Sequence, residues 1–69
     1  MKTIKEIRAR MIEIVGGKAE NLGFINARLV LRTGITLNDN ESSNSQDIAR
    51  VISALKDMGY AVEATGGKA

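Results

Sequence analysis

Carboxylates, hydroxyls and lysines are the side chains with which this chain can do acid–base or nucleophilic chemistry, because its 69 residues include no His and no Cys. Two pairs of acids have suggestive spacings: Glu6 and Glu13 are seven residues apart, and Asp39 and Glu41 lie in one polar segment. Neither pair has the apolar surroundings that prepare a carboxylate for catalysis. The usual zinc ligands are missing as well. We therefore expect a protein that is not an enzyme and that holds no metal or cofactor.

The charged side chains are distributed unevenly along the chain. Ten Lys and Arg residues against eight Asp and Glu residues give a net charge of +2. Residues 1–33 hold seven basic and three acidic side chains, whereas residues 34–69 hold three and five. A polyanion would therefore meet the N-terminal half first. The alternative is that these Lys and Arg residues are simply the solvated face of an amphipathic helix.

Helical periodicity is clearest near residues 3–15, where apolar residues recur at spacings of three and four. Thr3 can cap the start of this helix together with Glu6, and Gly16-Gly17 ends it, because glycine supplies the left-handed conformation that a helix end prefers. The apolar stripe consists of Ile4, Ile7, Met11, Ile14 and Val15.

The middle segment, residues 20–37, fits two periods. Its apolar residues at positions 22, 25 and 29 suit a helix that Gly34 ends, whereas those at 29, 31, 35 and 37 alternate as in a strand. We expect a helix over residues 21–33, followed by a short extended piece at residues 35–37. The alternative is an α+β fold with a central hairpin at about residues 27–37.

A polar segment rich in Asn, Asp and Ser precedes the third expected helix, over residues 44–58. Ser43 and Gln46 form a capping box, Asp47 complements the helix dipole, and Gly59 ends the helix. Residues 60–64 are expected to pair with residues 35–37. The sequence thus predicts a mainly α fold, a three-helix body with a small β hairpin or truncated wing. The predicted core consists of Ile4, Ile7, Met11, Leu22, Ile25, Leu29, Ile48, Val51, Ile52 and Leu55.

The stretch DIARVISALKDMGYAV, residues 47–62, combines an amphipathic helix holding one central arginine with a glycine stop, an aromatic residue and a strand. This pattern resembles winged helix-turn-helix domains, whose recognition helix runs from a polar capping segment to Gly-Tyr before the chain enters the wing. It is similar to small phage or plasmid regulators and to the winged-helix tail of virulence-associated E type primase-helicases. The resemblance covers about residues 27–63.

The resemblance implies that one face of the third helix enters the major groove of double-stranded DNA. Its residue types suit that task, because Gln and Asn pair with adenine, Arg pairs with guanine, and Ser bonds to a phosphate or a base edge. The implied groove-facing residues are Asn44, Ser45, Gln46, Ala49, Arg50 and Ser53. The implied phosphate contacts are Lys2, Lys5, Arg8, Arg28 and Arg32. The implied function is that of a small DNA-binding regulator of transcription.

A second hypothesis keeps the same helices and assigns them no DNA contact. In it, the chain is a protein-interaction module or inhibitor that binds a host or partner protein. Arg50 is then an exposed residue that pairs with Asp47 or Asp57, and the polar cluster at residues 44–46 only caps the helix. Salt separates the hypotheses, because DNA binding weakens steeply with added salt when several phosphates are contacted.

The length of the chain fits one domain, expected over residues 1–65, with a flexible tail at residues 66–69. No apolar run approaches the roughly 20 residues that a membrane-spanning helix needs, so we expect a cytoplasmic protein without membrane contact. With one Phe and one Tyr, the chain has little apolar area to bury alone. We therefore expect a homodimer that docks through the first helix.

Overall fold

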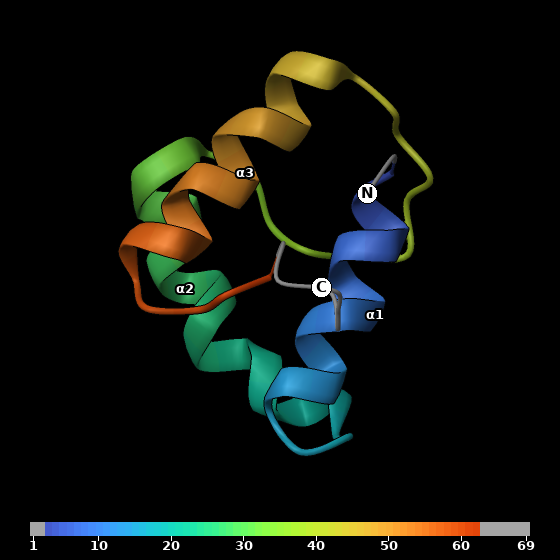
Figure 1. The fold of residues 1–69 in the computed structure, drawn as a ribbon, viewed down its shortest axis with the longest axis vertical. Coiled ribbons are helices and arrows are strands. Elements are labelled where there is room, and N and C mark those ends of the chain that lie inside the picture. Colours follow the sequence, from blue (N-terminus) through green and yellow to red (C-terminus); the bar gives the residue numbers. More distant parts are fainter. Residues whose placement is uncertain (1–2, 63–69) are drawn as a thin grey trace.

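The structure is a computed structural model that describes residues 3–62. It contains three α-helices, α1 (Ile4–Ile14), α2 (Leu22–Thr33) and α3 (Ser45–Asp57), and a 3-10 turn, η1 (Ala19–Asn21), that leads into α2. Figure 1 shows α2 and α3 packed beside each other, with α1 at their side. The fold is mainly α, which confirms that part of the prediction.

The predicted ends of α1 are confirmed. The hydroxyl of Thr3 accepts a hydrogen bond from the backbone N–H of Glu6 at 3.1 Å, which satisfies one donor of the first turn. At the other end, Gly16 has a φ of 96°, and the N–H of the next residue, Gly17, donates to the carbonyl of Ile12 at 2.7 Å. This bond spans the last turn in the manner of a Schellman motif, which requires a residue that tolerates positive φ.

Residues 22–33 form a helix, so the alternative of a central hairpin at residues 27–37 is wrong. Leu22, Ile25 and Leu29 are all buried, which a helical repeat achieves and a strand repeat would not. Gly34 ends α2 in the left-handed conformation, with a φ of 75°, and its N–H donates to the carbonyl of Val30 at 2.9 Å. The helical burial of three large side chains outweighs the β-branched residues near the end of α2.

The core between residues 3 and 62 is aliphatic and draws on all three helices. Nine of the ten predicted core residues are buried there. Ile52 is only half-buried, because it lies about 100° around α3 from Val51 and so falls at the edge of the buried stripe. Three further residues that the sequence did not predict complete this core, namely Leu37, Ala54 and Val62.

The segment between α2 and α3, residues 34–44, is irregular but well anchored. Leu37 donates its N–H to the side-chain oxygen of Asn26 at 2.8 Å, and its carbonyl accepts from the same amide group at 3.3 Å. Nearer α1, the N–H of Ile4 donates to the carbonyl of Ser42 at 3.0 Å. Figure 1 shows this segment leaving α2, passing α1 and climbing to α3. It therefore fixes α1 against the other two helices.

The predicted minor sheet is absent from the part of the chain that the structure describes. Residues 35–37 form no strand, because the backbone of Leu37 pairs with the side chain of Asn26 instead of a neighbouring strand. Residues 60–62 are irregular as well. Residues 63–64 of the predicted strand, and the predicted tail at residues 66–69, lie outside the described residues. Between residues 3 and 62, no helix has the length and apolarity required to span a bilayer.

Candidate nucleic-acid interface

The outward side of α3 carries most of the residues that the resemblance implies for groove contact. Their side chains are exposed, and none of them belongs to the core. Helical geometry gathers them on the half of α3 opposite its buried stripe. The residues of this outer α3 face are Ser45, Gln46, Ala49, Arg50 and Ser53.

Asn44 positions the start of this face, and it corrects one detail of the sequence prediction. Its side-chain oxygen accepts from the backbone N–H groups of Gln46 at 3.0 Å and Asp47 at 3.1 Å. Asn44 is therefore the N-cap, and the predicted capping box that starts at Ser43 is wrong. The carboxamide oxygen of Asn44 is already engaged, so only its NH₂ group is left for a DNA base.

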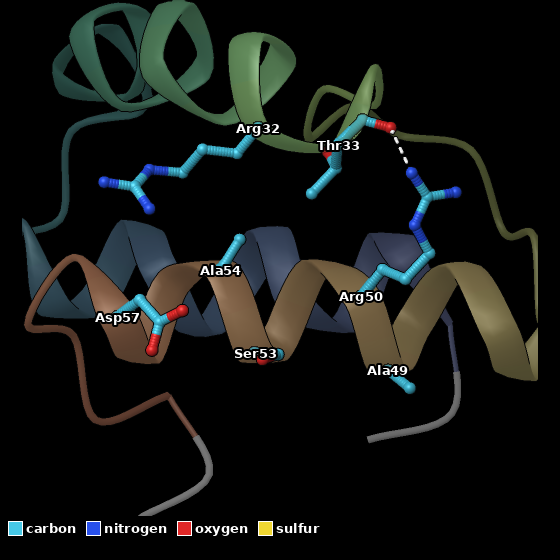
Figure 2. A pocket seen from close by; sticks show the side chains of 7 residues that line it. All are labelled: Arg32, Thr33, Ala49, Arg50, Ser53, Ala54 and Asp57. Atoms are coloured by element: carbon cyan, nitrogen blue, oxygen red, sulfur yellow. Dashed lines mark hydrogen bonds between the residues drawn. The ribbon is translucent and has the colours of Figure 1, made fainter.

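An open groove of about 530 Å³ runs between the C-terminal end of α2 and α3. Figure 2 shows Arg32 and Asp57 at one end of this groove and Arg50 at the other. With two arginines and one carboxylate along its walls, the groove carries a net positive charge. The residues that line it are Arg32, Thr33, Ala49, Arg50, Ser53, Ala54 and Asp57.

Arg50 links the outer α3 face to α2. Its guanidinium donates to the backbone carbonyl of Thr33 at 3.0 Å, as Figure 2 shows. This carbonyl lies at the C-terminal end of α2, where the helix dipole favours a positive charge. Asp47 is more remote, with 4.0 Å between its carboxylate and the guanidinium. Arg50 thus contacts Asp47 weakly, while its side chain stays 58% exposed and keeps further N–H groups available.

Two basic residues of α1 form ion pairs within the protein. Lys5 pairs with Glu41 at 3.3 Å, and Arg8 pairs with Asp39 at 3.1 Å. Both carboxylates come from the segment between α2 and α3, so these ion pairs fasten that segment to α1. Two of the implied phosphate contacts are therefore already balanced by an acid. Lys2, a third, lies outside the described residues.

Arg28 and Arg32 differ from the basic residues of α1. Both are exposed on α2, one helical turn apart, and neither forms an ion pair within residues 3–62. Arg32 also borders the groove beside α3. Of the implied phosphate contacts, Arg32 is therefore the one that the structure brings next to the outer α3 face, and Arg28 lies one turn before it on α2.

Sequence reasoning missed the partners of these charges. Lys5 and Glu41 are 36 residues apart, and Arg8 and Asp39 are 31 apart, so no local pattern links them. A signal does exist in the charge balance, because the acidic polar segment has no basic residue of its own between positions 34 and 44. Asp39 and Glu41 could therefore pair only with cations from other parts of the chain, or else remain solvated.

A second surface has a different composition. The outward side of α2 exposes Phe24 at 81% and Leu31 at 87%, with Val30 at 41%. Gly23 and Ala27 are on the same side of α2 and are exposed as well. We call these five residues the outer α2 face. It holds no charged side chain.

The outer α3 face and the outer α2 face differ in the side chains that they offer to solvent. Between residues 3 and 62, no three acidic side chains gather as a metal site would require. The outer α3 face offers hydrogen-bond donors and acceptors beside cations, and the outer α2 face offers apolar area. When the chain is compared with known proteins, no family model, no curated protein and no solved structure matches it.

Proposed function

We propose that this chain is a small, non-enzymatic DNA-binding protein that places the outer α3 face in the major groove. Gln46, Arg50 and Ser53 would contact base edges or nearby phosphates. Arg28 and Arg32 would contact the phosphate backbone from α2. The proposed contacts need no cofactor, because the protein's own side chains supply their hydrogen bonds and charges.

One observation carries the proposal: Arg32 lies across an open groove from the outer α3 face, and it has no acidic partner at ion-pair distance among residues 3–62. A phosphate beside that groove would meet cations that the protein leaves available. The polar residues of α3 would face the bases at the same time. This combination of backbone contact and base contact is what specific DNA recognition requires.

The linker changes how such a protein would sit on DNA. A helix-turn-helix joins its two helices by roughly three or four residues, whereas residues 34–44 separate α2 from α3 here. Because Lys5 and Arg8 of α1 are paired with acidic residues of this linker, they would contribute less to phosphate contact than cations without an acidic partner. The proposed interface therefore consists of α3 and the adjoining side of α2.

A gel-shift titration over a salt series tests the proposal. Duplexes selected from a random pool serve as the specific probe, and unselected duplexes serve as the non-specific one. Arg28→Ala and Arg32→Ala should each reduce the slope of log affinity against log salt by about 0.9, the value for one lost phosphate contact. The matched control is Lys5→Ala, which removes an α1 cation that already has a partner.

Two outcomes would contradict this interface. If the wild type shifts no duplex even at low salt, the protein does not bind DNA. If Lys5→Ala reduces the slope as much as Arg32→Ala does, then the phosphate contacts come from α1, and the assignment to α2 fails.

A protein-interaction module remains a second candidate, and the ion pairs favour it. Lys5–Glu41 and Arg8–Asp39 withdraw two cations from any polyanion, and Asp47 and Asp57 place negative charge beside Arg50. In that case the chain would bind a host or partner protein and no DNA. This candidate would be supported if the wild-type protein is folded and shifts no duplex at low salt.

A further inference from the structure

The outer α2 face is an apolar surface on a helix that already buries its opposite side. Leu22, Ile25 and Leu29 fill the core from α2, while Phe24 and Leu31 point to solvent. A helix that is apolar on both sides is typical of one that is covered on both sides. Among residues 3–62, these two side chains and Val30 are the exposed large hydrophobic residues.

The size of this face fits a modest protein contact. Phe24, Val30 and Leu31 together leave roughly 350 Å² of apolar side chain exposed, judged from typical side-chain areas. A standard interface buries about 800 Å² on each partner. The outer α2 face would therefore form the centre of a small interface whose polar surroundings supply the rest.

We infer that the outer α2 face binds the same face of a second copy of this chain, with the two α2 helices antiparallel about a twofold axis at Ala27. An axis at this position sets each residue opposite the one equally far on the other side of Ala27. Phe24 of one copy then lies opposite Val30 of the other, and Leu31 lies opposite Gly23. This inference does not depend on the proposed DNA binding.

The pattern of large and small residues supports a second copy as the occupant. Leu31, the most exposed of the three large apolar side chains on this face, meets Gly23, which has no side chain and nothing within 4 Å of the position a Cβ would take. Ala27 meets Ala27, so the two helix axes can approach closely. A large residue facing a small one on both sides of the axis gives a self-complementary surface without any change in the monomer.

Charge at the rim makes the arrangement testable by salt. α2 has no Asp or Glu, and Arg28 lies about 100° around the helix from Ala27, at the edge of the face. The twofold axis brings Arg28 of both copies to the same edge, where they repel. Added salt screens that repulsion, so the dimer should strengthen as salt rises. An acidic partner would show the opposite response.

Sedimentation equilibrium on the full chain, from low micromolar to millimolar concentration, tests this inference. We expect a reversible dimer that strengthens with salt. Leu31→Asp should weaken it by at least tenfold, since each interface then buries two carboxylates where the wild type has apolar side chains. Ala9→Asp is the matched control: Ala9 is exposed on α1, and its substitution should leave the dimer constant unchanged. Circular dichroism confirms that each variant is folded.

Disulfide trapping gives a second measurement, because the chain contains no native Cys. Ala27→Cys should form a crosslinked dimer under mild oxidation, since two Cys residues at the twofold axis approach within disulfide range. Ala9→Cys should remain largely monomeric. A monomer at every concentration, a dimer that Leu31→Asp leaves intact, a dimer that weakens with salt, or equal crosslinking at Ala9 and Ala27 would each overturn the inference.

Discussion

The outer faces of α2 and α3 differ in kind although the two helices pack side by side on one core. Their inner faces are alike, since Leu29 and Leu55 are both fully buried. On the outside, α3 presents polar side chains and Arg50, whereas α2 presents Phe24 and Leu31. Folding requires only the inner faces to be apolar, so it does not explain this difference. The outer faces are therefore where our proposals lie, a polar partner being proposed for α3 and a second copy of the chain for α2.

The largest expected effect separates the two sides of α2. Leu29→Ala should lower the free energy of unfolding by about 2–5 kcal/mol, because it leaves a cavity in the core. Leu31→Ala, two residues further on, should change it by less than about 0.5 kcal/mol in dilute solution, since Leu31 is solvated in the monomer. Urea denaturation at low micromolar concentration measures both.

The same pair of variants can contradict the comparison. Equal destabilisation by Leu29→Ala and Leu31→Ala would show that the outer α2 face is part of the monomer's packing. The face would then be unavailable to a second copy, and the contrast with α3 would disappear.

The inner faces are the part of this fold that the sequence predicts well. Spacings of three and four place Ile25 and Leu29 on one stripe, and Thr3 and Gly34 set helix ends where local bonds decide the geometry. The same local rules predict which residues of α3 are exposed, because they are simply the residues outside the stripe. Local periodicity is sufficient for these features.

Contacts between distant residues were not predictable in this way. The pairing of Asn26 with Leu37 replaces the predicted sheet, and it depends on how the linker folds back over α2. The bond from Arg50 to the Thr33 carbonyl depends on how α3 meets the end of α2. The dimer surface expected on α1 stays a prediction, although Ile4, Ile7 and Met11 of its apolar stripe are buried in the core of the single chain.

A medium effect should separate base contact from phosphate contact. Arg50→Ala should reduce discrimination between selected and unselected duplexes by about 1–3 kcal/mol, because one bidentate base contact is worth that much. Arg32→Ala should weaken binding to both duplexes alike. Competition gel shifts at fixed salt measure the ratio. If Arg50→Ala lowers both affinities equally, Arg50 makes no base contact, and its role is the hydrogen bond that joins α3 to the Thr33 carbonyl of α2.

A smaller effect tests what positions the outer α3 face. Asn44→Ala should lower the free energy of unfolding by about 1 kcal/mol, since two N–H groups of the first turn lose their acceptor. The matched control is Ser43→Ala, which removes a hydroxyl next to the cap and should change stability by only a few tenths of a kcal/mol. Thermal unfolding followed by circular dichroism compares the two. If Ser43→Ala lowers the stability more than Asn44→Ala does, Ser43 is the N-cap residue of α3.

The smallest expected effect tests whether α1 takes part in the DNA contact proposed for the outer α3 face. Lys5 and Glu41 are more than half exposed, so breaking their ion pair by Lys5→Ala should cost less than about 0.5 kcal/mol of stability. The more informative variant is Glu41→Gln, which leaves Lys5 in place without its counter-charge. If the outer α3 face binds DNA and α1 stays remote, Glu41→Gln should strengthen binding only slightly and leave the salt slope unchanged. A slope steeper by about 0.9 would mean that the freed Lys5 contacts a phosphate. The interface would then extend from α3 past the linker to α1, and Glu41 would act as the acid that holds this cation back.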